Sequence, residues 1–265
     1  GNNNTAVGDQ ALSLMTTADD NTAVGRSSLK ATTTGATNTA VGACSLRDNT
    51  EGANNVAVGS ESLRLNTTAT NNTAVGGRSL FTSTTGSCHT ALGNNAMKRT
   101  TTGASSTAVG YLALCSQTTG SFNTAIGICA GCTNTTGANI TAIGRNAQPS
   151  SATVSDEITL GDSNVTSLRC ADTSISSLSD LRDKKNIEDI PHGLDYILAL
   201  RPVKFDWNTR DGTRIDKKDY GFIAQELDKV EETFGNREYT RLVSKENPEK
   251  WEADPMKTYP ILIKA

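Results

Sequence analysis

The sequence predicts a mainly β protein, in which a repetitive parallel β-roll or β-helix rod of 17-residue coils precedes a small α+β domain. The first observation is the motif Asn-Thr-Ala-Val-Gly, which begins at Asn4 and returns with small changes as far as Gly161. Its closing glycines stand 17 residues apart at every step, and a fixed period of this length is typical of stacked repeats. The second observation is a change of composition after residue 178.

This change of composition divides the chain into two domains, 1–178 and 179–265. Residues 1–178 carry 9 Lys/Arg and 10 Asp/Glu, whereas residues 179–265 carry 16 and 18, so the charged fraction rises from about 11% to about 39%. The net charge is −3 and no basic run is interleaved with aromatic residues, which argues against a nucleic-acid partner. No run of 18 apolar residues is present, so we expect no membrane insertion.

Each repeat is expected to form one coil. Its Thr-Ala-Val segment alternates at a period of two, which predicts a short strand. A polar turn ends the coil, and the turn glycines at 35, 52, 86, 103, 120 and 137 are expected to supply a positive φ. A second apolar residue follows five positions after each valine: Leu12, Leu29, Leu46, Leu63, Leu80, Met97 and Leu114.

Stacked coils place equivalent residues in columns. The alanine of the motif does not vary from Ala6 to Ala142, which predicts a tight contact. The column of Val, Ile and Leu residues from Val7 to Leu160 is expected to bury one apolar stripe. Strand-paired coils rise about 4.8 Å each, so ten coils make a rod of roughly 50 Å. The motif asparagines are expected to hydrogen-bond along the stack, as amide ladders do: Asn4, Asn21, Asn38, Asn55, Asn72 and Asn123.

A 17-residue coil is thin, because one Val and one Leu per repeat form a small core for a single chain. We therefore expect burial shared between chains, in a homotrimer. The unit Ala-Val/Ile-Gly-x-x-Ala/Ser-Leu resembles the head repeats of trimeric autotransporter adhesins, which form parallel β-rolls, and the repeat arrays of viral fibre proteins. Disorder is the alternative for such a composition, but it does not explain a strict period together with an invariant alanine column.

The cysteines offer one further candidate site. Cys129 and Cys132 form a lone Cys-x-x-Cys, but no second pair and no nearby His completes a set of four ligands. Cys115 and Cys132 occupy the same position in adjacent repeats. We interpret the cysteines as small side chains in ladder positions, and we predict neither a metal nor a cofactor.

At the start of the second region, Ser179 and Lys184 could form a nucleophile and its base. A serine hydroxyl becomes reactive when a base takes its proton, and a lysine can do so if burial disfavours its charged form. Five residues of separation permit contact in a bent loop but do not demand it. The spacing alone therefore strongly favours a solvated charged turn.

Four motifs of this region occur in a fixed order: residues 179–187 (Ser-Asp-x-Arg-x-Lys-x-x-Ile), 194–203, 220–227 and 260–265 (Pro-Ile-Leu-Ile-Lys-Ala). Together they closely resemble the C-terminal intramolecular chaperone domain of endosialidases and of other phage tail fibres and tailspikes. The same domain occurs in a self-cleaving eukaryotic membrane-bound transcription factor. In that family the chain continues as a long helix in a three-stranded coiled coil, and we expect this sequence, which stops at Ala265, to lack that helix.

The resemblance implies a domain that trimerises, holds three chains in register while the fibre folds, and then releases itself. By resemblance, Ser179 is the catalytic serine and Lys184 its general base, in a serine peptidase that turns over once and does not act in trans. The cleavage site is the Ser179–Asp180 bond, and Asp180 and Arg182 shape the loop. Lys185 stands one position off the pattern and is the weaker candidate for the base.

The residues of this domain predict an α+β fold. A helix over 193–200 is expected to bury one face, formed by Leu194, Ile197 and Leu198. Further predictions are a strand at 203–207, a second strand or its end at 220–223, a helix at 224–230 and His192 at a helix start. Four aromatic residues are expected in the core or in contacts between chains: Trp207, Phe222, Trp251 and Tyr259.

These inferences predict a structural protein of a viral tail fibre or spike, located in the virion and assembled in the host cytoplasm. Its expected partners are two further copies of itself, other virion or tail proteins and, as a further candidate, a host-surface receptor. One alternative is a segment of a bacterial or prophage trimeric adhesin. Another is a trimerisation chaperone that holds the chains and does not cut.

Overall fold

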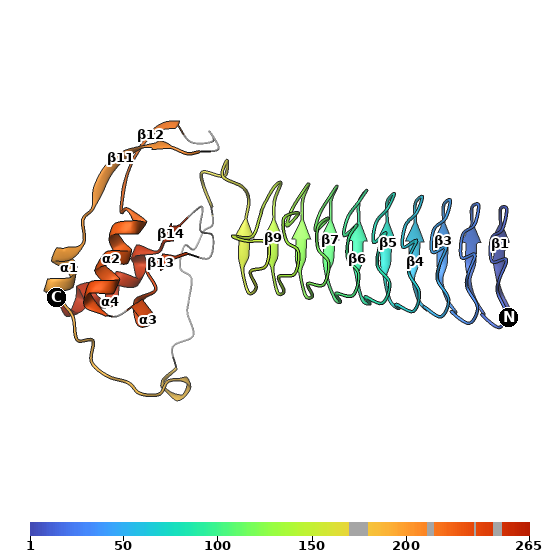
Figure 1. The fold of residues 1–265 in the computed structure, drawn as a ribbon, viewed down its shortest axis with the longest axis horizontal. Coiled ribbons are helices and arrows are strands. Elements are labelled where there is room, and N and C mark those ends of the chain that lie inside the picture. Colours follow the sequence, from blue (N-terminus) through green and yellow to red (C-terminus); the bar gives the residue numbers. More distant parts are fainter. Residues whose placement is uncertain (170–179, 211–214, 236, 246–250) are drawn as a thin grey trace. The chain divides into compact units, whose positions relative to one another are not determined.

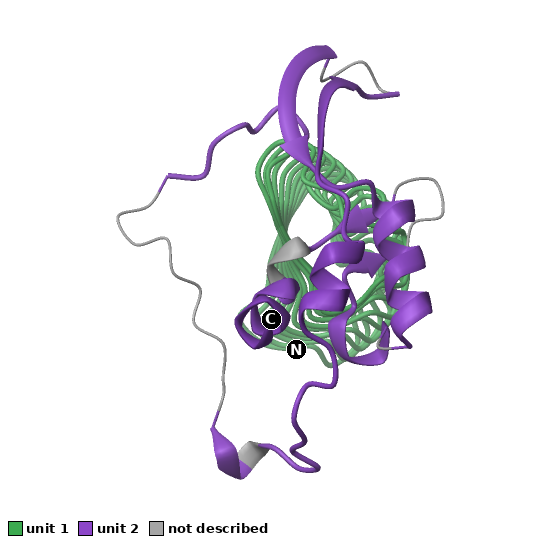
Figure 2. Ribbon diagram, turned by 90° about the vertical axis from the view of Figure 1, so that its left-hand side faces the viewer, with its two compact units in different colours: residues 1–162 green, residues 163–265 purple. Residues whose placement is uncertain are grey.

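The computed structural model describes residues 1–169, 180–210, 215–235, 237–245 and 251–265. The chain divides into two compact units, Gly1–Asp162 and Ser163–Ala265, which are coloured separately in Figure 2. The boundary predicted between residues 178 and 179 lies outside the described residues.

The first unit is a parallel β-solenoid with one three-residue strand in each coil (Figure 1). The strands form a single sheet in which each pairs with the next, and the register joins equivalent residues, such as Ala6 with Ala23. The predicted parallel architecture and its 17-residue coil are confirmed. The strands are β1 (Thr5–Val7), β2 (Thr22–Val24), β3 (Thr39–Val41), β4 (Val56–Val58), β5 (Thr73–Val75), β6 (Thr90–Leu92), β7 (Thr107–Val109), β8 (Thr124–Ile126), β9 (Thr141–Ile143) and β10 (Ile158–Leu160).

Two of the predicted columns form the core of the solenoid. The strand alanines from Ala23 to Ala142 are fully buried, because the central residue of each strand points into the coil. The second apolar column is buried as well, and Leu29, Leu46 and Met97 have no exposed surface. Alanine facing leucine therefore sets the thickness of the coil.

The Val/Ile/Leu column does not lie in this core, so the prediction that it buries an apolar stripe is wrong for the single chain. Val24 and Val41 are each 36% exposed, and Ile126 is 43% exposed. The reason is the alternation of a strand: when the central alanine points inward, both flanking residues point outward. The result is an apolar row along the outer face of the sheet.

The asparagine ladder is confirmed. The Oδ1 atom of Asn38 accepts hydrogen bonds from the backbone N–H of Asn55, at 3.0 Å, and from its Nδ2, at 3.1 Å. The Nδ2 atom of Asn38 also donates to the carbonyl of Gly52, at 2.8 Å, which ties the strand to a turn. The buried asparagines of this ladder are therefore paired both along the stack and across the coil, as Asn72 also shows.

His89 replaces asparagine at one position of this ladder and has the same partners. Its Nδ1 accepts the N–H of Ser106 at 3.2 Å, so the proton lies on Nε2, which donates to the carbonyl of Gly103 at 2.6 Å. Burial lowers the pKa of His89 below its usual value. A charged ring has no lone pair at Nδ1 and would lose the bond from Ser106.

We predict that the rod loses stability in mild acid through His89. Because the pKa of His89 is lower in the folded chain, its contribution is present above the unfolded value of about 6.5 and is lost as the pH falls below it. Thermal unfolding at pH 7 and at pH 5 should show a larger loss for the wild type than for His89→Asn, which restores the ladder residue. An equal loss in both proteins would contradict this assignment.

The turn glycines are explained by close approach, and the prediction of a positive φ at them is wrong. A Cβ at Gly35 would lie 2.3 Å from the carbonyl oxygen of Gly52 in the next coil. Positive φ instead belongs to the glycine that ends the motif, for example 129° at Gly59. Both glycines are required because neighbouring coils stack backbone on backbone.

The second unit is a small α+β region, as predicted. The predicted helix over 224–230 is present and extends to Phe234, where Gly235 ends it with a φ of 66°. No helix among the described residues is long and apolar enough to cross a membrane. The elements of the second unit are η1 (Leu181–Asp183), α1 (Leu194–Ala199), β11 (Val203–Asn208), β12 (Ile215–Gly221), α2 (Ala224–Phe234), α3 (Arg237–Thr240), β13 (Val243–Ser244), β14 (Glu252–Ala253), η2 (Pro255–Thr258) and α4 (Tyr259–Lys264).

The core of this unit is formed by residues of the helices α1, α2 and α4 and by the residue that precedes β13. Tyr196, Leu227, Leu242 and Ile261 are buried together. The prediction that Leu194 and Leu198 form the buried face of the first helix is wrong, since they are 56% and 74% exposed. A helix of six residues has fewer than two turns, so it has room for few buried side chains. In α1 the buried side chain is Tyr196, whose ring packs against the ring of Phe234.

The remaining aromatic predictions divide between the two roles. Phe222 packs against the core, whereas Tyr259 is 53% exposed, which favours its second predicted role, contact with another chain. His192 precedes α1, as predicted, and its Nε2 lies 3.1 Å from the carbonyl oxygen of Phe234, joining the start of α1 to the end of α2.

Candidate functional site

The loop predicted to carry the cleavage chemistry begins with an aspartate cap. The Oδ1 atom of Asp180 accepts the backbone N–H of Arg182 at 2.9 Å, which starts the short helix η1. The guanidinium of Arg182 also donates to this carboxylate from Nε and Nη2, and Nη2 lies 2.6 Å from Oδ2. These hydrogen bonds lower the pKa of Asp180 and raise that of Arg182.

The two residues predicted to shape the loop are thus in direct contact, and both are exposed. An exposed pair of this kind adds little to stability, since water screens it. What it supplies is local geometry: a carboxylate held by three donors fixes the backbone directly after residue 179. Their part in cleavage remains a prediction.

Lys184 follows at the end of η1. Its backbone N–H donates to the carbonyl of Leu181 at 3.2 Å, its backbone is extended, and the residue is exposed in the single chain. Ser179, the predicted nucleophile, lies outside the described residues, as does its bond to Asp180. The contact between Ser179 and Lys184 therefore also remains a prediction.

Two of the four sequence motifs are joined by an ion pair. The guanidinium of Arg201, which precedes β11, binds the carboxylate of Glu226 near the start of α2, with its Nε at 2.9 Å from Oε2. The hydrogen bond from Arg201 lowers the pKa of Glu226. The pair links segments that lie 25 residues apart in the sequence.

A buried polar cluster on α2 was missed by the sequence reasoning. The Oε1 atom of Glu231, which is fully buried, accepts from the hydroxyl of Thr240 at 2.5 Å and from the N–H of Leu242 at 2.6 Å. Asp228, one turn earlier, binds Arg237 and Lys245. The only sequence signal was the position of Glu231, four residues after Leu227 and three after Asp228, which places it beside both on the helix surface. The cluster fastens α3 and β13 to α2.

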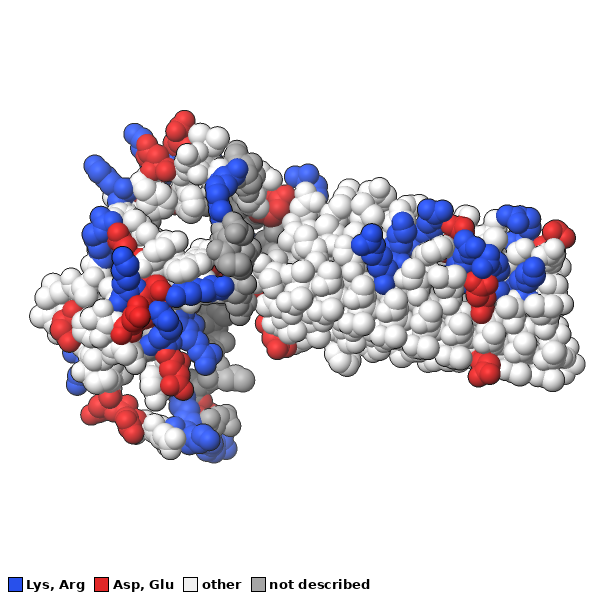
Figure 3. Space-filling model, in the orientation of Figure 1, with Lys and Arg blue, Asp and Glu red and all other residues white. Residues whose placement is uncertain are grey.

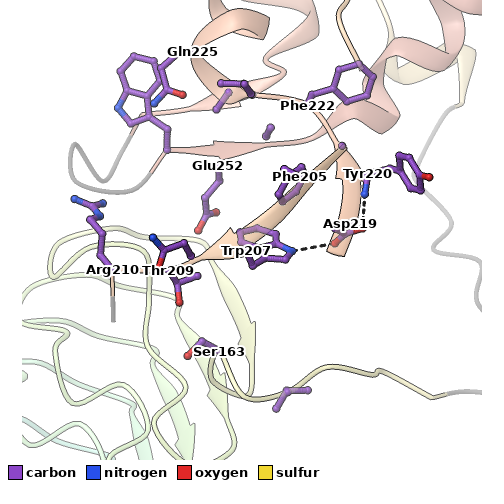
Figure 4. Close-up of a pocket in the computed structure, with 17 residues that line it drawn as sticks. Ser163, Phe205, Trp207, Thr209, Arg210, Asp219, Tyr220, Phe222, Gln225 and Glu252 are labelled. Atoms are coloured by element: carbon purple, nitrogen blue, oxygen red, sulfur yellow. Dashed lines mark hydrogen bonds between the residues drawn. The ribbon is translucent and has the colours of Figure 1, made fainter. Parts of the chain in front are cut away.

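The hairpin of β11 and β12 borders an open hollow with aromatic lining (Figure 4). Phe205 and Trp207 lie edge to face with ring centroids 5.1 Å apart, and Trp207 Nε1 donates to Oδ2 of Asp219 at 3.1 Å. Trp251 lines the same hollow and lies under the ammonium of Lys245. These rings are half-buried, and aromatic rings that remain partly accessible are enriched where proteins contact other protein chains.

The predicted ladder positions of the cysteines are seen at Cys115, whose sulfur lies 3.9 Å from the carbonyl oxygen of Cys132 in the next coil. Among the residues described, no group of three or more His, Cys, Asp or Glu side chains is placed to hold a metal ion. Burial raises the pKa of the Cys132 thiol, whose sulfur accepts a hydrogen bond from Nε2 of Gln148 at 3.4 Å. A partly buried thiol with a raised pKa is less reactive than a free one, because less of it is present as thiolate.

Comparison with known proteins gives one match. The family model of peptidase S74, described as the chaperone of endosialidase, matches residues 179–236. A search of curated proteins and a search of solved structures return no match. The matched range begins at Ser179 and ends just after α2. It therefore contains the capped loop, the Arg201–Glu226 pair and the hairpin. The chain thus combines a parallel β-solenoid of 17-residue coils with a segment, residues 179–236, that matches the endosialidase chaperone, and this combination fits a tail-fibre-like protein.

Proposed function

We propose that this chain is a segment of a viral fibre whose C-terminal domain brings three copies together and aligns them. The domain then releases itself by cutting the bond between Ser179 and Asp180. The observation that carries the proposal is the family match, which begins at Ser179 and follows a solenoid of equivalent coils.

The solenoid needs an external device to set its register. Each strand repeats Thr-Ala-Val or a close variant, so a slip of one coil between chains replaces residues by near-identical residues. Pairing between such strands is weakly specified. A globular domain that trimerises at one end, before the coils associate, supplies the alignment that the repeats lack.

The exposed Val/Ile/Leu column supports association of the rod. It runs along the whole sheet, and its residues are roughly two-fifths exposed in the single chain at Val75, Leu92 and Ile143. Covering such surface contributes about 25 cal/mol per Å² of apolar area. Three copies meeting along this column would provide the burial that the thin coil cannot provide alone.

Helices α1 and α4 support association of the chaperone domain. The two helices pack against each other, and each also exposes large apolar side chains. Leu198 of α1 is 74% exposed and Ile263 of α4 is 87% exposed. Apolar side chains of this size, gathered on neighbouring elements, favour a surface that another chain covers.

The proposed cleavage follows from the chemistry of the pair. The amine of Lys184 takes the hydroxyl proton of Ser179, and the serine oxygen attacks the scissile carbonyl. The bond to the nitrogen of Asp180 breaks as that nitrogen takes the proton from Lys184, and water then hydrolyses the ester and restores the serine hydroxyl. A lysine acts as a base when it is withdrawn from water, but Lys184 is exposed in the single chain. The withdrawal must therefore come from neighbouring chains, so cleavage should follow trimer formation.

We predict that a variant unable to trimerise stays uncut. Leu198→Glu combined with Ile263→Glu places two charges on the exposed surface of α1 and α4, where the folded single chain tolerates them. Sedimentation should show a monomer, and a denaturing gel should show one intact chain. Leu198→Met with Ile263→Leu is the control, and it should trimerise and cut. If the glutamate variant trimerises and cuts like the wild type, this surface is not the contact.

A further inference from the structure

Positive charge is concentrated on one part of the solenoid. Figure 3 shows blue side chains gathered along one edge of the rod, toward the N-terminal end. Apart from Arg145, every Lys and Arg of residues 1–162 lies between positions 26 and 99. We call this set the basic ladder: Arg26, Lys30, Arg47, Arg64, Arg78, Lys98 and Arg99.

The ladder follows the repeat. Lys30, Arg47 and Arg64 stand 17 residues apart, at the same position of three successive coils, and Lys98 returns to this position two coils later. Equivalent positions of stacked coils are about 4.8 Å apart along the axis. The cations therefore form a row parallel to the rod, which suits a ligand with regularly repeated negative charges.

Nearby acids neutralise only part of this charge. Glu61 is shared by Arg78, at 2.6 Å, and Arg64, at 2.7 Å, and these arginines lower its pKa. Arg47 pairs with Asp48 at 2.7 Å. Within residues 1–162, all of which are described, four members of the ladder form no ion pair: Arg26, Lys30, Lys98 and Arg99. The row keeps an excess of positive charge.

The ladder also borders a shallow groove. Arg26, Lys30 and Arg47 line it together with Gln10 and Ser27, which are neutral and polar, and with Leu14 and Asp48, the partner of Arg47. A groove with cations at one position and amide or hydroxyl groups beside them offers ion pairing and hydrogen bonding to one ligand. Because this groove lies at the N-terminal end of the ladder, we expect a ligand to bind there.

We propose that the basic ladder binds an acidic polysaccharide that lies along the rod. A linear polymer of acidic sugars matches the row of cations with its carboxylates, and its hydroxyls match the polar groups of the groove. The proposal goes beyond the trimer-forming function and stands on the solenoid alone.

The same surface fits other polyanions poorly. Single-stranded nucleic acids require aromatic faces on which bases stack. The ring of Phe81, which interrupts the cation row, already lies between two guanidinium groups, with Arg64 and Arg78 centred 5.6 Å and 5.8 Å from its centroid. A membrane surface would require several large apolar side chains beside the cations for insertion, whereas Leu14 is the one large apolar side chain that lines the groove.

The test is binding of the full chain to polygalacturonate, a linear polymer of uronic acids, measured at several salt concentrations. Neutral dextran and single-stranded poly(U) are the comparison polymers. The key variant is Lys30→Ser with Lys98→Ser and Arg99→Thr. Serine occupies the equivalent position of the first coil, at Ser13, and threonine that of Arg99 in the preceding coil, at Thr82, so the repeat already accepts these residues. Arg145→Ser, outside the ladder, is the control.

We expect the wild type to bind polygalacturonate more tightly than poly(U) and not to bind dextran, with affinity falling as salt rises. The triple variant should lose at least tenfold in affinity and show a shallower salt dependence, while Arg145→Ser should bind within twofold of the wild type. Circular dichroism should show the same fold in all three. Three results would overturn the proposal: no binding of polygalacturonate at low salt, equal binding by the triple variant, or binding of poly(U) as tight as that of polygalacturonate.

Discussion

Replacing Ser179 or Lys184 by alanine is expected to abolish the cleavage of this chain completely. On a denaturing gel, the wild type should give two fragments, residues 1–179 and 180–265, and each variant should give one intact chain. The physical reason is that the two residues act as a unit: the hydroxyl is inert without its base, and the base has nothing to activate without the hydroxyl.

The matched control is the neighbouring lysine. Lys185→Ala removes the same charge one position from the expected base, and it should cut like the wild type. Sequencing the N-terminus of the smaller fragment should give Asp180 as its first residue. If Lys185→Ala remains whole while Lys184→Ala cuts, the base is misassigned. If the wild type itself remains whole as a trimer, the alternative of a chaperone that does not cut is correct.

The second large effect is expected at a glycine of the solenoid. Gly59→Ala places a Cβ 2.7 Å from the backbone carbonyl of Gly76 in the next coil, at a φ of 129° that side chains rarely adopt. Strain at such a position costs about 3 kcal/mol at the upper end of its usual range. This corresponds to a fall of about 6–12 °C in the midpoint of thermal unfolding.

Circular dichroism on a Ser179→Ala background measures this effect on one uncut species. Ser60→Ala is the control, because Ser60 is exposed, directly follows Gly59, and occupies a position where the preceding coil carries Ala43. The control should unfold within about a degree of its parent, as surface substitutions usually do. A Gly59→Ala rod as stable as the control would show that the coils do not stack as closely as described.

The solenoid was predictable because its signal is repeated. A single Thr-Ala-Val is a weak indication of a strand, but the same segment at a fixed period predicts strand, register and stacking together. The buried Ala and Leu columns and the Asn ladder followed from that period. The period does not specify which residues of a coil point inward, so the outward column of valines was predicted incorrectly. Nor does it specify how closely the backbones of neighbouring coils approach, so the role of the turn glycines was predicted incorrectly as well.

The chaperone domain was predictable by its motifs more than by its periodicity. Its first helix is six residues long, too short for a periodic pattern, so Tyr196 was missed as its buried residue. Glu231 was missed because its partners, Thr240 and Leu242, follow a turn whose direction the sequence does not reveal. The basic ladder was missed for a related reason: its cations occupy four different positions of the repeat, and only the coil brings them onto one edge.

The central claim is that the domain after residue 178 assembles the rod, and the mass of the native particle tests it most directly. The chain with Ser179→Ala, which stays uncut, should form one species of three 27.9 kDa chains in sedimentation. A chain synthesised only to Leu178 should give no uniform trimer, because nothing aligns its coils. A shortened chain that forms the same uniform trimer would contradict the claim.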